Sequence, residues 1–286
     1  VQYPPRGEIF DRNGEYLAQN RVCYDLMVIY RELPREGFDT LQMLDLLGIS
    51  RTKLERALRN ARMSPRIPYM VTNFISSEVK LRFDENDFPG FYTVYRTIRS
   101  YPRKIGGNLL GDVGEINERQ LKMKRYADYR SGDYVGQSGV EKAYEEELRG
   151  KKGVKIMEKD THGVVKGSYM DGMFDSLPEP GNYIVTTIDA RLQAFTEELM
   201  RGKVGAAVAI EPSTGEILMM VSSPTFDPDE MVGRHRGNNY MKMLYNKRQP
   251  MFNRAVKAKY PPGSTFKLVQ GLIGLQEGVL TPADRY

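Results

Sequence analysis

Ser264 and Lys267 are the residues whose types and spacing are best suited to chemistry. They lie in the string Gly-Ser-Thr-Phe-Lys at residues 263–267, at the start of a helix predicted from about 264 to 277. At positions i and i+3 of a helix, a hydroxyl and an amine lie on one face, where a proton can pass between them. The free backbone N–H groups of a helix N-terminus favour an oxyanion at the same point. The pattern is that of a serine nucleophile with a lysine base.

The same pair also has a purely structural interpretation. Ser-x-x-Lys occurs by chance in many proteins, and a serine at a helix start is commonly an N-cap. A lysine accepts a proton only when its amine is neutral, and burial among apolar side chains favours the neutral form. In the assembled site, burial against Phe266 and the interior of the helix would favour that form, and the surrounding sequence decides between the two interpretations.

The composition excludes several classes of protein. The chain has 286 residues, 42 Lys and Arg against 37 Asp and Glu, and 40% hydrophobic residues, which is typical of a globular protein with room for two domains. The formal charge of +5 is small and the basic residues are scattered, so no nucleic-acid partner is predicted. Cys23 is the single cysteine, and His162, interpreted as a turn residue, is far from His235, so neither a metal site nor a cofactor is predicted. The longest apolar run, at 204–210, is much shorter than the about 20 residues that cross a bilayer.

The elements that must position the pair lie in the second half of the chain. The predicted helix at 264–277 is apolar on nearly all sides, which is typical of a helix inside a domain. Before it, the sequence predicts a strand, a helix, two strands joined by a Pro/Gly turn, and a polar loop around Asn238 and Asn239. The four regular elements are expected at 182–187, 189–201, 204–210 and 216–222.

The first half reads as a separate α+β unit. Asn13-Gly14 favours a tight hairpin turn between strands at 8–11 and 15–18. Capping boxes are predicted at Thr52/Glu55 and at Ser138/Glu141. Further elements are predicted as extended stretches at 23–30 and 91–99, and as helices at 39–47, 51–61, 77–82 and about 138–149. Tyr126, Tyr129 and Tyr134 suggest either a solvated helix face, which we favour, or a glycan-binding surface.

Four motifs resemble those of the class B penicillin-binding proteins, in the order found in that family. They are Arg-Gly-x-Ile-x-Asp-Arg-Asn-Gly-x-x-Leu-Ala at 6–18, Gly-x-x-Gly-Val-Glu-x-x-Tyr-Glu-x-x-Leu-Arg-Gly at 136–150, Pro-x-Thr-Gly-Glu-Ile-Leu with Ser-x-Pro-x-Phe-Asp-Pro at 212–228, and Asn-Arg-Ala with Tyr-Pro-Pro-Gly-Ser-Thr-Phe-Lys at 253–267. The last string is most similar to the elongation-type enzymes, with the division-type enzymes as the alternative.

The resemblance implies an α+β architecture in two parts. Residues 1–177 would form an elongated pedestal, a dimerisation-type domain with an inserted small α+β head subdomain at about 35–110. Residues 178–286 would form the amino-terminal part of a penicilloyl-serine transferase domain, which is β-lactamase-like. By motif match, Ser264 would be the nucleophile and Lys267 the base.

The resemblance also implies an activity and a location. Members of the family cross-link peptidoglycan by serine-mediated acyl transfer from the D-Ala-D-Ala end of a stem peptide, and β-lactams acylate the same serine. Their pedestal contacts a membrane-embedded glycosyltransferase. They are single-pass inner-membrane proteins with periplasmic domains, and the membrane anchor is not expected within this chain.

The sequence departs from the family after Lys267. The family's Ser-x-Asn and Lys-Thr/Ser-Gly motifs should follow at a long interval, and the chain contains neither. We therefore expect an amino-terminal part that is inactive by itself, with Phe266, Leu268, Leu272 and Leu275 less buried than the pedestal core.

Two other functions stay open at this point. One is a β-lactamase or β-lactam sensor, because Ser-Thr-Phe-Lys with a following apolar helix is also similar to the serine β-lactamases. The other is a non-catalytic cell-wall scaffold protein. The long amino-terminal half argues against the first, and the intact Ser264/Lys267 pair argues against the second.

Overall fold

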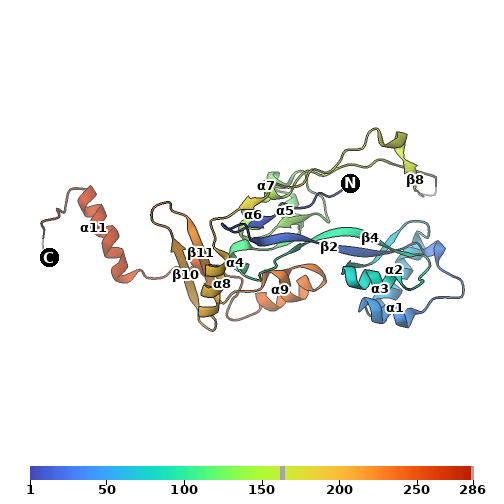
Figure 1. The fold of residues 1–286 in the computed structure, drawn as a ribbon, viewed down its shortest axis with the longest axis horizontal. Coiled ribbons are helices and arrows are strands. Elements are labelled where there is room, and N and C mark those ends of the chain that lie inside the picture. Colours follow the sequence, from blue (N-terminus) through green and yellow to red (C-terminus); the bar gives the residue numbers. More distant parts are fainter. Residues whose placement is uncertain (162–164, 285–286) are drawn as a thin grey trace.

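The computed structural model describes residues 1–161 and 165–284, in an elongated arrangement (Figure 1). A head of three helices lies at one end, a sheet with its covering helices fills the middle, and the last helix projects from the other end. His162 lies outside the described residues. In the part of the chain that the structure describes, no helix combines the length and apolar character that a membrane span requires.

A five-stranded sheet runs through the middle of the molecule. Its strands are β1 (Ile9–Phe10), β2 (Tyr16–Val28), β3 (Tyr69–Ile75), β4 (Phe91–Ser100) and β9 (Ile184–Val185). Strand β1 lies antiparallel to β2 and parallel to β9, and β2 pairs with both β3 and β4. The predicted strand near 182–187 is therefore present, and it returns the chain to its first strand.

Asp11 fixes the predicted hairpin turn. The backbone N–H groups of Asn13 and Glu15 both donate to its Oδ1 at 2.8 Å, and Gly14 has φ +82°, which glycine adopts without strain. The backbone N–H of Ala190 donates to Oδ2 of the same carboxylate. Burial alone would raise the pKa of Asp11, but these backbone hydrogen bonds hold it below its ordinary value.

Strand β2 is longer than predicted. The sequence indicates two extended segments, at 15–18 and 23–30, whereas the structure has one continuous strand from Tyr16 to Val28. Strand β4 pairs with it without a break from Gln19 to Val28, so the ladder keeps the polar residues between the two segments extended. The two strands form a ribbon that leads from the middle of the molecule into the head (Figure 1).

The head consists of three helices packed on β3 and on the far ends of β2 and β4. The helices are α1 (Thr40–Leu47), α2 (Arg51–Met63) and α3 (Ser77–Asp84). Their apolar faces share one core, which includes Leu26, Val28, Met43, Leu54, Val71, Ile75, Phe83 and Phe91. The helices predicted here from apolar periodicity are confirmed.

The predicted capping box at Thr52/Glu55 is wrong. Helix α2 begins one residue after Ser50, whose hydroxyl accepts a hydrogen bond from the Lys53 backbone N–H at 3.3 Å. Thr52 lies inside the first turn, and Glu55 pairs with Arg51 at 2.9 Å. Two candidate caps stand close together in the sequence, and the earlier one begins the helix.

Between the end of β4 and the start of β9, the pedestal is built from short elements. They are α4 (Gly107–Leu110), β5 (Val113–Glu115), α5 (Glu118–Leu121), β6 (Tyr134–Gly136), α6 (Gly139–Ala143), α7 (Glu145–Leu148), β7 (Met157–Lys159) and β8 (Val165–Ser168). Tyr126 and Tyr129 are buried in a small core with Ile116 and Val135. The favoured interpretation as a solvated face is therefore wrong for Tyr126 and Tyr129, which offer no open surface to a glycan, whereas Tyr134 is 40% exposed.

Glu141 is the buried centre of the pedestal. Its carboxylate accepts from Arg6 Nε at 2.7 Å and from Arg99 Nε at 2.6 Å, and it is fully buried. Arg6 also pairs with Glu145 at 2.7 Å, and the Tyr101 hydroxyl donates to Glu141 at 3.2 Å. Burial alone would raise the pKa of Glu141, but the charges of Arg99 and Arg6 lower it.

The predicted Ser138/Glu141 capping box is also wrong. The Ser138 hydroxyl makes no cap hydrogen bond and donates instead to Asp112 Oδ1 at 2.7 Å. Glu141 turns inward because two guanidinium groups offer a stronger partnership than a backbone N–H does. The motif therefore fixes tertiary contacts more than a helix start.

The second half of the chain begins a new layer against the pedestal. Its elements are α8 (Ala190–Leu199), β10 (Gly205–Ile210), β11 (Ile217–Ser223), α9 (Arg236–Leu244), α10 (Arg254–Lys257) and α11 (Phe266–Gln276). The predicted strands at 204–210 and 216–222 form an antiparallel hairpin, as expected. The polar loop predicted around Asn238 is wrong, because these residues form α9.

Helix α11 is exposed, as predicted for this chain. Phe266 is 44% exposed, Leu268 76%, Leu272 67% and Leu275 45%, whereas Ile9 in the pedestal core is fully buried. Figure 1 shows the helix projecting from the body. The described residues of this chain therefore leave the apolar surface of α11 uncovered.

Replacing Glu141 by Gln should destabilise the chain. The variant leaves the buried Arg99 guanidinium without its anion and leaves Arg6 with Glu145 alone. Loss of one member of a buried ion pair typically costs about 3–5 kcal/mol. The free energy of unfolding in urea at pH 7 measures this loss. Glu146→Gln, which removes an exposed carboxylate from the same motif, is the control and should change stability little. Equal stability of the two variants would show that the pair contributes nothing net.

The same variant should alter the pH dependence of stability. The folded pKa of Glu141 is lowered, so its contribution is present above the unfolded value of about 4.3 and is lost as pH falls through the folded pKa. The wild-type advantage over Glu141→Gln should therefore shrink on acidification. Urea titrations at a series of pH values between neutral and strongly acid test this, and an advantage that grows in acid would contradict it.

Candidate active site

Ser264 and Lys267 lie on one continuous helical segment. Ser264 is in a 3-10 turn, Gly263–Thr265, which leads directly into α11, where Lys267 is the second residue. Gly263 begins the turn with φ +58°, a conformation that favours glycine. The Thr265 hydroxyl donates to the Pro262 carbonyl at 2.5 Å and ties the turn to the preceding chain. The backbone thus places the serine and the lysine one turn apart.

The expected cover over Lys267 is absent from the described part of this chain. Ser264 and Lys267 are both exposed, and Phe266 is only partly covered. Neither side chain makes a hydrogen bond or ion pair with another residue that the structure describes. This exposure agrees with the expectation that this chain alone leaves the helix uncovered, and the described residues supply no enclosing groups for the pair.

Arg254 holds the loop that leads toward Ser264. It is almost fully buried, and its guanidinium donates to the carbonyls of Arg248 at 2.7 Å, Gln249 at 3.0 Å and Phe252 at 3.3 Å. Its backbone N–H donates to the Ser222 hydroxyl at 2.9 Å, which in turn donates to the Phe252 carbonyl at 3.0 Å. One side chain thereby fixes the loop against the end of β11. In the sequence, Arg254 is recognisable only as part of the Asn-Arg-Ala motif, which indicates no role for its side chain.

The pedestal holds the same loop from the other side. Asn108, on α4, donates to the Pro250 carbonyl at 2.9 Å, and Asn253 donates to the Asn108 carbonyl at 3.1 Å. Asn253 also caps α10 by accepting from the Ala255 backbone N–H at 3.1 Å. These contacts join a pedestal helix to Pro250 and Asn253, which precede Ser264 by 14 and 11 residues. No pattern in the sequence indicates that Asn108 takes part.

Two carboxylates extend this interface. Glu197 of α8 accepts from the Gly106 backbone N–H at 2.7 Å, and Asp229 accepts from the Tyr101 backbone N–H at 2.9 Å. Burial raises the pKa of Glu197, although hydrogen bonds from Gln193 and Gly106 oppose the shift. Each contact pairs a side chain of the second half with backbone of the pedestal.

Arg236 also joins the second half of the chain to the pedestal, and this contact explains why α9 forms. Its guanidinium donates to Asp112 Oδ2 at 2.6 Å and to the Val113 carbonyl at 3.2 Å. It lies so close to Gly114 that a Cβ there would be 2.4 Å from Nη2. This anchor sits at the first residue of α9, so tertiary contact outweighs the poor helix propensity of Asn238 and Asn239.

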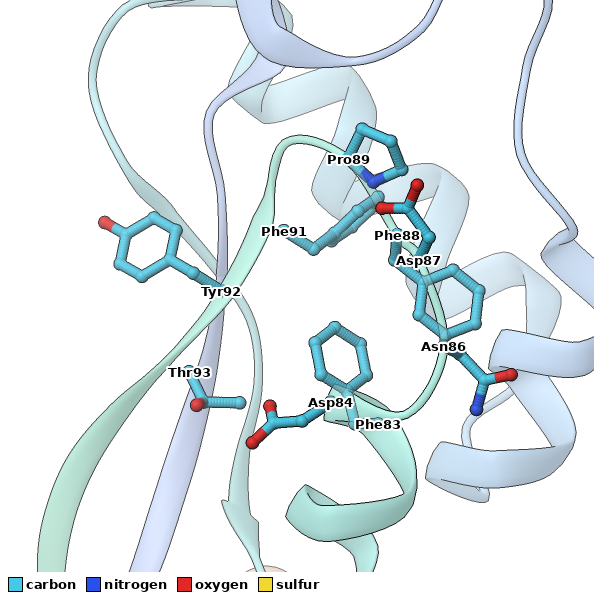
Figure 2. Close-up of a pocket in the computed structure, with 9 residues that line it drawn as sticks. All are labelled: Phe83, Asp84, Asn86, Asp87, Phe88, Pro89, Phe91, Tyr92 and Thr93. Carbon is cyan, nitrogen blue, oxygen red and sulfur yellow. The ribbon is translucent and has the colours of Figure 1, made fainter.

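A cavity of about 410 Å³ lies in the head, away from the motif residues (Figure 2). It opens between the loop after α3 and the start of β4, and it contains no part of the Ser264 segment. The lining residues are Phe83, Asp84, Asn86, Asp87, Phe88, Pro89, Phe91, Tyr92 and Thr93. Within residues 1–161 and 165–284, no group of three or more His, Cys, Asp or Glu side chains is arranged to hold a metal ion.

Removing the Arg254 guanidinium should loosen the loop before Ser264. Arg254→Ala removes the side-chain donor of the Arg248 carbonyl and one of two donors each of the Gln249 and Phe252 carbonyls. A hydrogen bond to a charged group contributes about 1.5–3 kcal/mol. We expect a lower unfolding midpoint and faster amide exchange at residues 248–252. Lys247→Ala removes an exposed cation from the same loop and should leave both nearly unchanged. Equal protection of the amides at residues 248–252 against exchange in the two variants would show that the Arg254 guanidinium does not hold the loop.

The chain matches two domain families over most of its length. The pattern of the penicillin-binding protein dimerisation domain matches residues 1–186, and that of the penicillin binding protein transpeptidase domain matches residues 205–286. Both matches agree with the motifs at 6–18 and 253–267.

Curated relatives carry the same two parts. The peptidoglycan D,D-transpeptidase MrdA of Acinetobacter baumannii is 33% identical over 283 residues, covering 97% of this chain and 41% of the relative. MrdA of Escherichia coli K12 is 32% identical over 294 residues, covering 97% of this chain and 44% of the relative. The chain thus spans less than half the length of these relatives.

Solved structures give the same answer for the fold. The complex of penicillin-binding protein 2 (PBP2) with MreC from Helicobacter pylori has a TM-score of 0.71 at 26% identity, over 99% of this chain and 53% of that chain. A structure titled for coordination of polymerization and crosslinking by a peptidoglycan synthase complex has a TM-score of 0.67 at 30% identity, over all of this chain and 49% of that chain. The relatives named MrdA and PBP2 bear out the resemblance to elongation-type enzymes. This chain belongs to the penicillin-binding proteins and contains their dimerisation domain with the start of their transpeptidase domain.

Proposed function

We propose that the protein containing this chain cross-links peptidoglycan as a serine-type D,D-transpeptidase. The observation that carries the proposal is the Ser264/Lys267 pair, one turn apart on one helical segment within residues that match the transpeptidase domain. In this proposal residues 1–177 are the pedestal, with a head at about 35–110, and residues 178–286 supply the amino-terminal part of the transpeptidase domain.

Ser264 and Lys267 divide the chemistry between them. Lys267 takes the hydroxyl proton as Ser264 Oγ attacks the carbonyl carbon of the D-Ala-D-Ala peptide bond. The terminal D-Ala leaves as an amine after protonation, and an acyl-serine ester remains. An amine on a neighbouring stem peptide then attacks the ester, forms the cross-link and returns the proton to the serine oxygen. A β-lactam would enter at the first step and stay on Ser264.

The pair needs groups that this chain does not supply. Lys267 is exposed here, whereas a working base must be kept neutral in a drier site. The family's Ser-x-Asn and Lys-Thr/Ser-Gly motifs are absent from the sequence. The exposed apolar side chains of α11 offer a surface on which such elements would pack. We therefore expect the 286-residue chain alone to neither cross-link peptides nor retain penicillin.

The proposal includes partners and a location. The family resemblance suggests a membrane-embedded glycosyltransferase that contacts the pedestal, and an inner-membrane protein with periplasmic domains. The structural relatives support partners of this kind, because one is a complex of PBP2 with MreC and another is named as part of a peptidoglycan synthase complex. The dimerisation-domain match over residues 1–186 disfavours a β-lactamase.

Full-length protein should lose covalent penicillin binding when Ser264 is replaced by Ala. A fluorescent penicillin followed by digestion and mass spectrometry should place the adduct of the wild-type protein on the peptide that holds Ser264. Ser213→Ala, in an exposed turn, is the control and should label normally. An adduct on another residue would refute the assignment, rapid loss of the label would indicate a β-lactamase, and no label on wild-type protein would indicate a scaffold.

Lys267→Met should slow acylation of the full-length protein without preventing its folding. A positioned proton acceptor contributes a factor of about 10² to 10⁴ to the rate, and methionine keeps the length of the side chain without the amine. Stopped-flow or gel-based acylation rates measure the change. Lys257→Met on α10 removes an exposed amine nearby and should have little effect. A Lys267→Met rate near that of wild type would mean that another group is the base.

A further inference from the structure

Arg234 bridges the head and the transpeptidase part of the chain. It lies in a 3-10 turn, Gly233–His235, just before α9. Its Nη1 donates to the Leu47 carbonyl at 3.1 Å and its Nη2 donates to the Asn73 carbonyl at 3.3 Å. Leu47 ends α1 and Asn73 lies in β3, so one guanidinium holds two separate elements of the head.

Among the residues that the structure describes, no further hydrogen bond or ion pair joins residues 35–90 to residues after 187. The rest of the 35–110 segment contacts the second half through Tyr101, Lys104, Gly106 and Asn108. The head is otherwise carried on the β2–β4 ribbon, which leads into it from the pedestal (Figure 1). A domain held through a small contact area is expected to move relative to its neighbour. Arg234 therefore supplies the hydrogen bonds that join residues 35–90 to the second half of the chain, in addition to the β2–β4 ribbon.

Opposing electrostatic effects act on the Arg234 contact. The Leu47 carbonyl is at the negative end of the α1 dipole, which attracts the guanidinium. No carboxylate of the described residues forms an ion pair with Arg234. Burial lowers the pKa of Arg234, and both burial and the charge of Arg234 lower the pKa of nearby Lys53. Attraction to two carbonyls is thus opposed by desolvation and by a second cation.

The Asn73 carbonyl, which accepts a hydrogen bond from Arg234, precedes a residue with an unusual backbone conformation. Phe74, the residue after Asn73, has φ +56°, which is rare for a bulky side chain. Its backbone N–H donates to Asp25 Oδ1 at 3.3 Å, and Arg96 pairs with the same carboxylate at 3.1 Å. Arg96 also lies over the rings of Phe74 at 5.2 Å and Tyr134 at 5.7 Å. Through Arg96 and Tyr134, these contacts connect the Asn73–Phe74 segment of β3 to pedestal strand β6.

We propose that Arg234 is an interdomain positioning residue that sets the orientation of the head relative to the transpeptidase domain. Arg236, two residues later, anchors α9 to Asp112 of the pedestal, so the 234–236 segment contacts the head and the pedestal together. A rotation of the head about the β2–β4 ribbon is therefore transmitted through Arg234 to residues 233–235, which lead into α9. This coupling is independent of whether Ser264 is the nucleophile.

Distances between spin labels on the 286-residue chain test the proposal. One pair, Arg56→Cys with Lys242→Cys, joins α2 of the head to α9, and a second pair, Arg56→Cys with Glu85→Cys, lies within the head; all three positions are exposed. Cys23 is retained, because it is buried and burial raises the pKa of its thiol to about 11, which disfavours labelling. Mass spectrometry confirms that it stays unlabelled.

Arg234→Ala should broaden and shift the distribution between the head and α9 while leaving the distribution within the head unchanged. Arg234→Lys, which keeps the charge but loses the planar fork, should give an intermediate width. Arg201→Ala, on an exposed surface pair, is the control and should match wild type. The proposal is overturned if Arg234→Ala matches the control, or if the distance within the head changes as much as the distance between the parts.

Discussion

The requirement that the buried Glu141 carboxylate be paired governs the architecture of the pedestal. An ionised carboxylate removed from water is tolerated only with charged partners and hydrogen bonds. Glu141 obtains them from Arg6, before β1, and from Arg99, near the end of β4. Two distant segments of the chain must therefore meet α6 at one point. A glycine of the second motif makes close packing at this point possible, since a Cβ on Gly136 would lie 2.1 Å from the Glu141 carbonyl oxygen.

The same point is linked to the transpeptidase part. Tyr101 reaches Glu141 with its hydroxyl and Asp229 with its backbone N–H. Asn108 and Arg236 add contacts of the same kind, in which a side chain of one part binds backbone of the other. Contacts to backbone specify where the chain runs and tolerate change in neighbouring side chains. The pedestal thereby fixes the path of the segment that leads to Ser264.

Local patterns allowed much of the fold to be predicted, and tertiary contacts explain most of the errors. The helices of the head and the β10–β11 hairpin follow from periodicity and turn residues. Ser138 has the right type and spacing for a cap, yet its hydroxyl binds Asp112, a residue that no local rule connects to it. Helix α9 contradicts its own sequence because Arg236 is anchored to the pedestal. The Arg236–Asp112 contact spans 124 positions and the Ser138–Asp112 contact spans 26, whereas the error at α2 is local, because Ser50, two residues before Thr52, begins the helix.

The candidate site follows the same division between local and distant determinants. Ser264 and Lys267 are three residues apart, so helix geometry alone brings them together, and the sequence suffices to predict that they lie one turn apart. Whether the lysine is neutral depends on what surrounds it, and the exposure of Phe266 and Lys267 shows that α11 does not create a dry site by itself. The chemistry of the pair is thus a property of packing around the helix, whereas the identity of the pair is a property of the helix.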